Sequence, residues 1–170
     1  MRLFVAILFS PQVREVLLGA IDSLRAQAVS GSFTRPENLH LTLAFIGESE
    51  DPEAAAKAVD AAAGPPFYLA VRGFGHFGDL WWAGVEKNPA LTALTERLTE
   101  GLRRRGFHVD KRPFKPHITL ARRVEPRGDV QLSIPRTGMT VGRVCLMKSE
   151  RIRGILTYTE IYGRELKSGV

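Results

Sequence analysis

The stretch His40-Leu41-Thr42-Leu43 returns almost unchanged as His117-Ile118-Thr119-Leu120, 77 residues further along the chain. Each copy places a histidine and a threonine two residues apart within an otherwise apolar run. Side chains two residues apart on a β-strand point to the same face. Each copy therefore predicts a strand that presents an imidazole beside a hydroxyl, with a hydrophobic face behind them. We call residues 40–43 the first motif and residues 117–120 the second motif.

The segments that lead into the two motifs are also alike. A basic, proline-containing segment precedes each motif, at residues 34–39 and 112–116, and each segment follows an amphipathic helical pattern. The repetition predicts an α+β fold with two lobes of about 80 residues related by duplication, each giving one strand to a shared cleft. No connection is long enough to separate independent domains. We therefore expect residues 1–170 to form a single domain of two interleaved lobes.

Three helices are predicted by a capping residue followed by proline at the first helical position. These pairs are Ser10-Pro11, Asp51-Pro52 and Asn88-Pro89. The second helix is expected to end by Gly64 and the third at Gly106. Between the helices, runs typical of β-strands occupy residues 2–9, 39–46, 67–74, 80–85, 116–122, 138–148 and 157–163.

Composition indicates an ordinary soluble globular protein, with 44% hydrophobic and 25% charged residues. Cys145 is the only cysteine, so the chain has no disulfide and no thiolate metal cluster, and we expect a buried thiol and a cytoplasmic location. The apolar run at residues 1–9 is short and stops at Ser10-Pro11, which favours a buried strand over a signal peptide. No stretch approaches the roughly 20 apolar residues that a membrane span needs. We expect a monomer without membrane contact.

Positive charge is concentrated around the second motif. The net charge is +6, yet the window of residues 103–123 contains eight basic residues and one acidic residue, Asp110. Part of this cluster has a structural explanation, because cations at residues 103–105 suit the C-terminal end of the third helix. The rest favours an anionic ligand such as phosphate or RNA. The basic residues of the window are Arg103, Arg104, Arg105, Lys111, Arg112, Lys115, Arg122 and Arg123.

A pair of histidines on facing strands can perform acid–base chemistry at neutral pH. A neutral imidazole accepts a proton from water, and a protonated one donates a proton to a leaving oxygen. Thr42 and Thr119 are hydroxyl donors suited to the non-bridging oxygens of a phosphate. This combination is what cleavage of a phosphodiester requires when no metal takes part.

Other interpretations of these residues compete with this one. Two histidines can bind a metal, but no Asp, Glu or Cys recurs at ligand spacing around either of them, and we expect no metal and no cofactor. Either motif alone is also compatible with a strand whose polar residues face solvent. His76 and His108 lack a threonine partner and are expected to be surface or structural histidines. For the adjacent residues 81–82, two tryptophans, we favour packing over base stacking.

The paired motifs resemble those of the 2H phosphoesterase superfamily, and within it the RNA 2′,3′-cyclic phosphodiesterases long called 2′-5′ RNA ligases. The resemblance covers nearly the whole chain. It rests on residues 2–7, residues 37–47 and residues 112–122, and on a tail with Leu146, Ser149, Gly154 and Tyr158 in the family's spacing.

The resemblance implies a bilobal α+β fold in which each lobe has an antiparallel sheet and outer helices, with both histidines in a central groove. It implies metal-independent hydrolysis of an RNA 2′,3′-cyclic phosphate end, or of a cyclic nucleotide, to a 2′-phosphomonoester. His40 would then be the proton donor and His117 the proton acceptor. Positive charge from residues 112–123 would lower the pKa of His117, which agrees with a base.

Arg122 also matches the family's motif, which implies that it binds the phosphate. Strict alternation nevertheless places its side chain on the opposite face from His117 and Thr119. The strand must bend or end near Ala121, or Arg122 must reach the groove from its rim.

Several functions remain open at the level of sequence. Within the superfamily, the substrate could be a small cyclic nucleotide or a 2′-5′-linked oligonucleotide, and 2′-5′ RNA ligation could be the reverse reaction. A different class of protein, a non-catalytic basic RNA-binding module, would also account for the charge and the aromatic residues. Such a module does not need two titratable groups.

Overall fold

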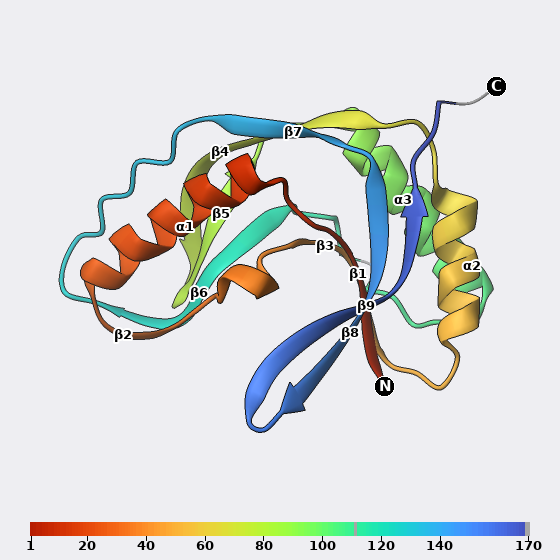
Figure 1. Ribbon diagram of the computed structural model, residues 1–170, viewed down its shortest axis with the longest axis horizontal. Helices are drawn as coiled ribbons and strands as arrows, with labels where there is room; N and C mark the ends of the chain where they lie inside the picture. The colour runs from red at the N-terminus through yellow and green to blue at the C-terminus, as the bar shows by residue number, and fades with distance from the viewer. Residues whose placement is uncertain (111, 169–170) are drawn as a thin grey trace.

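The computed structural model describes residues 1–110 and 112–168 (Figure 1). Within these residues the chain forms nine β-strands, three α-helices and one short 3₁₀ helix. In chain order they are β1 (Arg2–Ile7), α1 (Pro11–Ala26), β2 (Ala28–Phe33), η1 (Pro36–Asn38), β3 (Leu41–Glu48), α2 (Pro52–Ala62), β4 (Phe67–Phe77), β5 (Leu80–Val85), α3 (Pro89–Arg104), β6 (His117–Pro126), β7 (Thr137–Val141), β8 (Arg143–Ile152) and β9 (Ile155–Glu165).

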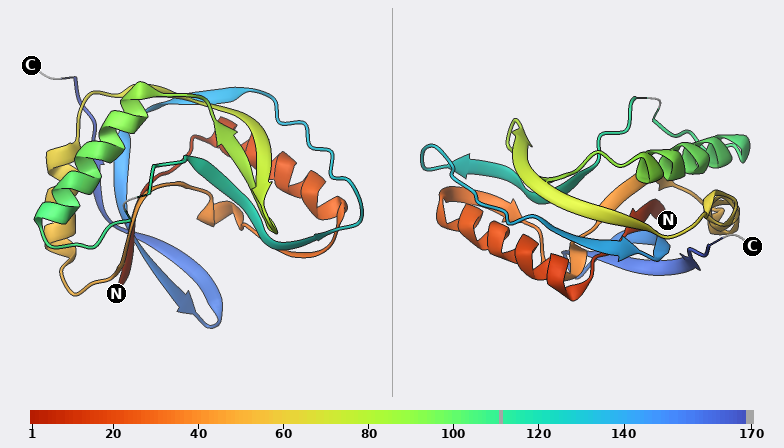
Figure 2. Two further views of the ribbon diagram at one scale, coloured as in Figure 1. Left: turned by 180° about the vertical axis from the view of Figure 1, so that it is seen from behind. Right: turned by 90° about the horizontal axis from the view of Figure 1, so that it is seen from above.

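The strands form two antiparallel sheets, which confirms the α+β prediction. The first sheet has the order β3-β1-β8-β9 and the second has the order β2-β6-β5-β4-β7. The first motif therefore leads into an edge strand of one sheet, while the second motif lies on an inner strand of the other. Helix α1 packs on β2, β6 and β7 of the second sheet, and α2 packs on α3 and on β8 and β9 of the first sheet (Figure 2).

The two lobes do not correspond to the two halves of the chain. The first sheet combines β1 and β3 with β8 and β9, and the second combines β2 with β4 to β7. Helix α1 precedes β3 of the first sheet in the chain but packs on the second sheet. The chain therefore passes repeatedly from one lobe to the other, and the first sheet needs residues from both ends of the sequence.

The helices begin where the capping pairs predict. The side chains of Ser10, Asp51 and Asn88 each accept a hydrogen bond from a backbone N–H three residues later, at 3.4, 3.0 and 3.0 Å respectively. In each case proline follows at the first helical position. Among the described residues, no helix has the length and apolar character required to cross a membrane.

Besides small differences at strand ends, the strand prediction misses one strand and joins two others into one. Strand β2 is missing from the prediction because its residues, including Ser30, Gly31 and Ser32, are small and mostly exposed. Its main chain pairs with β6 without a buried face of its own. The expected strand at 138–148 is two strands, β7 in the second sheet and β8 in the first, separated at Gly142. A continuous apolar pattern does not reveal that the chain changes sheets within it.

Both motif strands contain a β-bulge directly after the motif threonine. In the first sheet, successive residues Val5 and Ala6 pair with Ala44 and Thr42, so Leu43 is an extra residue on β3. In the second sheet, Trp81 and Trp82 pair with Ala121 and Thr119, so Leu120 is an extra residue on β6. The repeat therefore extends beyond the sequence motif into the same local irregularity of the backbone.

The bulge changes which face the following residues occupy. Leu120 and Ala121 are both fully buried although they are consecutive, which an unbroken strand with one solvent face does not allow. Arg122, the next residue, returns to the face of His117 and Thr119. Strict alternation would place Arg122 on the opposite face, and the extra residue at Leu120 is the irregularity next to Ala121 that removes this conflict.

The opposite sides of the first sheet belong to different hydrophobic clusters. Its inner side, with Leu3, Val5 and Ile7, joins the main core under the helices. The other side carries a small second cluster of Phe4, Ala6, Cys145 and Met147, with Tyr158 packed against it. Cys145 is buried as expected, and burial is the main cause that raises the pKa of its thiol to about 12.

Gly84 lies opposite His117 in the sheet and has no room for a side chain. A Cβ atom there would lie 2.5 Å from the backbone carbonyl oxygen of Arg72. We expect Gly84→Ala to lower the free energy of unfolding by about 1–3 kcal/mol, because the backbone of β4 or β5 must shift. Urea denaturation measures the change.

Gly19 supplies a matched control for this substitution. It is exposed within α1, and a Cβ atom placed there would have no neighbouring atom within 4 Å. Gly19→Ala should raise the free energy of unfolding by about 0.5–1 kcal/mol through helix propensity. Equal stabilities of Gly84→Ala and the wild type would contradict the proposed clash.

Candidate active site

His40 lies one residue before β3 and is held at both ring nitrogens. Its Nδ1 lies 2.7 Å from the backbone carbonyl oxygen of Asn38, and its Nε2 lies 2.9 Å from Oγ1 of Thr42. Because a carbonyl oxygen only accepts, Nδ1 carries a proton and donates it. In the neutral ring, Nε2 then accepts from the hydroxyl of Thr42. The structure therefore places the histidine and threonine of the first motif side by side.

His117 is oriented in the same way. It is the first residue of β6, and its Nδ1 lies 2.9 Å from the backbone carbonyl oxygen of Lys115. In both motifs the carbonyl two residues before the histidine thus accepts the proton of Nδ1. This arrangement directs Nε2 of each ring away from its own backbone and leaves it as the nitrogen that can exchange a proton.

The environments of the two imidazoles differ. His40 packs against the rings of Phe4 and Tyr158, with centroid distances of 5.0 and 5.1 Å, and Tyr158 meets it edge-on at 90°. His117 has one aromatic neighbour among the described residues, Phe77, at 5.6 Å. Phe77 is 51% exposed, whereas Phe4 is buried. His40 therefore lies in a largely apolar aromatic setting, and His117 lies in a more open one.

Sequence reasoning does not identify these aromatic residues as part of the site. Phe4 belongs to an apolar strand and looks like any core residue, and Phe77 lies at the end of β4 with no motif around it. Tyr158 matches the family's spacing, but no role follows from that match. The buried side chain of Asn38 is also missed, although it donates a hydrogen bond to the carbonyl oxygen of Leu156 on β9, at 3.0 Å. No local pattern indicates a contact between residues so distant in the chain.

The pKa of His40 is lowered from its ordinary value of 6.5, chiefly by burial. Its hydrogen bond to the carbonyl of Asn38 opposes this shift, while the positive charges of Arg122 and His117 add to it. Arg122 and His117 therefore lie within electrostatic reach of His40, although they belong to the other sheet. Arg122, a member of the basic run, thus contributes to lowering the pKa of His40 in the first motif as well as lying next to the second motif in sequence.

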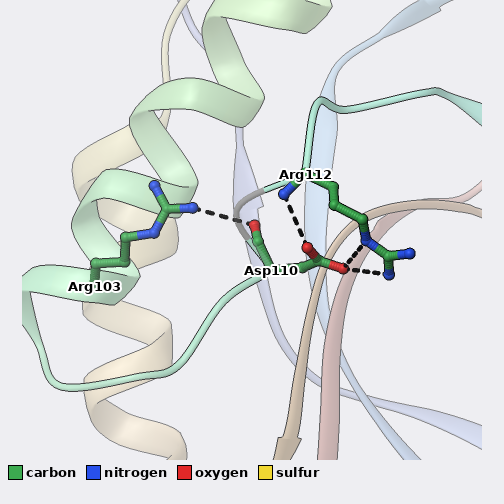
Figure 3. Close-up of polar contacts among 3 residues, drawn as sticks. All are labelled: Arg103, Asp110 and Arg112. Atoms are coloured by element: carbon green, nitrogen blue, oxygen red, sulfur yellow. Dashed lines mark hydrogen bonds and ion pairs between the residues drawn. The ribbon is translucent and has the colours of Figure 1, made fainter.

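Much of the predicted basic cluster is used in local contacts (Figure 3). The carboxylate of Asp110 accepts hydrogen bonds from the backbone N–H of Arg112 at 2.9 Å and from its Nε at 2.8 Å. The hydrogen bond from the Arg112 side chain is the main cause that lowers the pKa of Asp110 to about 2. Arg103 donates to the carbonyl oxygen of Asp110 at 3.1 Å. These contacts tie the end of α3 to the segment that leads into the second motif.

Other arginines among residues 103–123 also make local ion pairs or hydrogen bonds. Arg104 pairs with Glu100 at 3.0 Å, and Arg105 donates to the carbonyl oxygen of Gly101 at 3.0 Å. Arg123 adopts a left-handed φ of 54° beyond the bulge. Lys111 lies outside the described residues. Of the described residues of the window, Arg122 is the one whose positive charge contributes to lowering the pKa of His40.

The tryptophans pack as expected, and the remaining histidines lie at the surface. Trp81 is buried and stacks on His76 with a centroid distance of 4.5 Å. Trp82 is half-buried and lies directly opposite Thr119 on the neighbouring strand. His76 and His108 are exposed. Over residues 1–110 and 112–168, no three His, Cys, Asp or Glu side chains gather in a group that could hold a metal ion.

Comparison with known proteins places this arrangement in a family context. A family model of the 2′-5′ RNA ligase superfamily matches residues 11–153. Among curated proteins, the chain is similar to an RNA 2′,3′-cyclic phosphodiesterase of Escherichia coli, 33% identical over 175 residues that cover 94% of this chain and 93% of that protein. It is also 32% identical to one of Geobacillus stearothermophilus over 129 residues, which cover 71% of this chain but 41% of that protein.

Solved structures show the same overall architecture. A crystal structure of a Thermus thermophilus protein superposes with a TM-score of 0.87 at 30% identity and covers 99% of both chains. The structure of E. coli LigT complexed with 3′-AMP superposes with a TM-score of 0.82 at 29% identity and covers 97% of both chains. The likeness thus extends over the whole of both lobes.

The electrostatics of His40 can be measured directly. We expect its imidazole to titrate below pH 6.5 in NMR spectra of the free protein, with Nδ1 protonated in the neutral ring. Arg122→Gln should move the titration upward, because one positive charge near the ring is removed. The pKa of His40 in this variant should stay below 6.5, because burial lowers it more than Arg122 does. A titration unchanged by Arg122→Gln would show that Arg122 does not lie near His40.

Proposed function

This chain belongs to the 2′-5′ RNA ligase superfamily, and we propose that it hydrolyses 2′,3′-cyclic phosphate ends of RNA to 2′-phosphomonoesters without a metal. Its enzyme class is that of its curated relatives, RNA 2′,3′-cyclic phosphodiesterase. One observation carries the proposal: two sheets present two imidazoles in the same orientation, each held by a carbonyl two residues earlier, within electrostatic reach of one another.

His117 acts in this proposal as the general base. Its Nδ1–H is bound to the carbonyl of Lys115, so the lone pair of Nε2 accepts a proton from a water molecule. The oxygen of that water forms a bond to phosphorus as the bond from phosphorus to the 3′ oxygen breaks. His40 donates the proton of its Nε2 to the departing 3′ oxygen. The products are a 2′-phosphomonoester and a 3′-hydroxyl, and the two rings exchange protons with solvent to reset.

The threonines and Arg122 stabilise the charge on the phosphate. Thr42 and Thr119 are hydroxyl donors beside the two histidines, and Arg122 returns to the same face as His117 through the bulge. A guanidinium near the non-bridging oxygens offsets the negative charge that grows in the transition state. This role gives the bulge a catalytic purpose, because an unbroken strand would point Arg122 away.

Substrate binding supplies the condition that His40 needs to act as an acid. In the free protein the pKa of His40 is lowered, chiefly by burial and further by Arg122 and His117. An anionic phosphate in the groove offsets the two positive charges and favours the imidazolium. His40 therefore takes up its proton together with the substrate. The packed rings of Phe4 and Tyr158 keep bulk water from competing for that proton.

The same residues provide a route to 2′-5′ RNA ligation. If a 5′-hydroxyl of a second RNA replaces water, His117 removes its proton, and the phosphorus forms a 2′-5′ linkage as the 3′ oxygen leaves. The name of the superfamily favours this second reaction. All groups that the chemistry needs come from one chain, so we propose that the protein acts as a monomer.

Removal of either imidazole tests the acid–base pair. We expect His40→Ala and His117→Ala each to lower kcat on a cyclic-phosphate-ended oligonucleotide by about 10²–10⁴. Activity of the wild type should be unchanged by EDTA. His76→Ala is the matched control, because this exposed histidine stacks on Trp81 outside the motifs. Circular dichroism checks that each variant is folded, and full activity of either motif variant would refute the mechanism.

A modified leaving group separates the two roles. Sulfur in place of the 3′ oxygen of the cyclic phosphate gives a thiolate, which leaves without being protonated. The sulfur substrate should restore turnover by His40→Ala while His117→Ala stays inactive, because only the acid becomes dispensable. Restoration of His117→Ala instead would reverse the assignment of acid and base.

The pH profile provides a further test. The bell-shaped profile of kcat/KM reports macroscopic pKa values of the histidine pair in the free enzyme. Because the pKa of His40 is lowered from 6.5, the acidic limb should lie below this pH. The acidic limb of kcat should lie at higher pH, since bound phosphate favours the protonated rings. If the acidic limbs of kcat and kcat/KM lie at the same pH, the charge of the substrate does not act on His40.

A further inference from the structure

The first sheet continues beyond His40 as a hairpin of β8 and β9 that projects from the body of the molecule (Figure 1). Its turn lies between Ile152 and Ile155, which pair across the two strands and are 46% and 48% exposed. Asn38 ties the hairpin to the first motif through the carbonyl of Leu156. The hairpin is therefore attached directly to the segment that orients His40, yet the proposed reaction uses no residue near its tip.

Pairing of the strands shows which residues share the face of the catalytic groove. Ser149 of β8 lies opposite Arg2 of β1 on one side and opposite Tyr158 of β9 on the other. These three residues therefore occupy one face, and it is the face on which the ring of Tyr158 contacts His40. Arg151 follows two residues after Ser149, so its side chain lies on the same face, nearer the tip.

Arg2 and Arg151 extend the positive charge of the site outward along this face. The charges of Arg122 and Arg2 both lower the pKa of Tyr158 against the larger effect of burial, which raises it. Both guanidinium groups therefore lie near the Tyr158 hydroxyl. The positive charge thus extends from Arg122 at the reacting phosphate, past Arg2, to Arg151 on the hairpin.

Neither arginine on this face is neutralised by the protein. Within residues 1–110 and 112–168, no carboxylate forms an ion pair with Arg2 or Arg151. The guanidinium of Arg2 lies 4.9 Å from the centroid of the Phe45 ring. Arg151 donates to the backbone carbonyl oxygen of Gly154 at 3.0 Å. Glu48, which lies opposite Arg2 in the sheet, pairs with the N-terminal amine instead.

The position of Phe45 follows from the bulge. Phe45 occupies the place on β3 that Arg122 occupies on β6, one residue after the buried pair that contains the bulge. It returns to the groove face, opposite Phe4, and is 49% exposed. A guanidinium held over an aromatic ring keeps free N–H donors around its edge. Phe45 therefore holds Arg2 in place with its donors available to an anion.

We propose that Arg2, Phe45 and Arg151 form a strand-binding surface for the sugar–phosphate backbone of the nucleotides that precede the terminal cyclic phosphate. This inference rests on the proposed function and specifies its substrate: an RNA strand rather than a cyclic mononucleotide. A chain with its last phosphate between the histidines carries one negative charge per nucleotide. Guanidinium groups bind such phosphates through paired N–H donors. The surface supplies affinity for the strand and leaves the chemical step to the two motifs.

The test compares a cyclic-phosphate-ended oligonucleotide with a 2′,3′-cyclic mononucleotide. Arg151→Gln should lower kcat/KM for the oligonucleotide by about 3- to 10-fold at low salt, through KM, and leave the mononucleotide within about two-fold. The slope of log KM against log salt should become shallower by about 0.7, the value for one phosphate contact on a single strand. Phe45→Leu should lower kcat/KM for the oligonucleotide by a smaller factor, because Arg2 keeps its charge but loses the aromatic ring that holds it in place.

Arg104→Gln is the matched control. It removes the same charge from a side chain that is 75% exposed, on helix α3 away from the hairpin (Figure 1). It should leave both substrates and the salt slope unchanged. The proposal is overturned if Arg151→Gln behaves like Arg104→Gln, or if Arg151→Gln slows both substrates equally.

Direct binding distinguishes failure of this proposal from failure of the proposed function. If the wild type hydrolyses neither substrate, the proposed function is wrong. Fluorescence anisotropy with a 3′-phosphorylated RNA oligonucleotide still tests whether the strand-binding surface binds RNA. Weaker, less salt-dependent binding by Arg151→Gln than by Arg104→Gln supports it, and equal binding by the two variants refutes it.

Discussion

One extra residue directly after the motif threonine of each motif strand determines the arrangement of the site. A regular strand alternates its side chains, so residues that precede and follow a buried position share a face. The bulges at Leu43 and Leu120 place two consecutive residues in the core and return the next side chain to the groove. Without them, Arg122 would point into the protein or require a partner there, at a high cost in free energy. The charge of Arg122 lies near the motif histidines because the strands are irregular.

The two motifs lie on strands with the same irregularity, but the surroundings of their histidines differ. Both histidines donate Nδ1–H to a carbonyl two residues earlier, but His40 packs against Phe4 and Tyr158, while the aromatic neighbour of His117 is the exposed Phe77. At the equivalent position after the bulge, the first strand carries Phe45 and the second carries Arg122. Nearly identical motifs can therefore take opposite roles in proton transfer, since the pKa of an imidazole depends on its neighbours. The asymmetry comes from residues outside the motifs.

Local signals predict local structure well in this chain. The three helices begin at their capping pairs because a cap needs only residues within one turn, and the paired motifs identify the two histidines that the structure brings near one another. Features that depend on distant pairing are not predictable in this way. Strand β2 pairs through its main chain, residues 138–148 divide between two sheets, and Asn38 binds Leu156 across the fold. The basic window looks like one patch in the sequence because its pairing with Asp110 is not visible in a charge count.

The interleaving of the two sheets has a consequence for how the protein becomes active. β1 is synthesised before β3 and β8, and it lies between them in the first sheet. One of its edges stays unpaired until residues 143–152 have been made, and Tyr158 arrives still later. The aromatic packing around His40 therefore forms only after residue 158 has been made. Long-range pairing of this kind slows folding, and a nascent chain that has not reached Tyr158 does not hold His40 in its final surroundings.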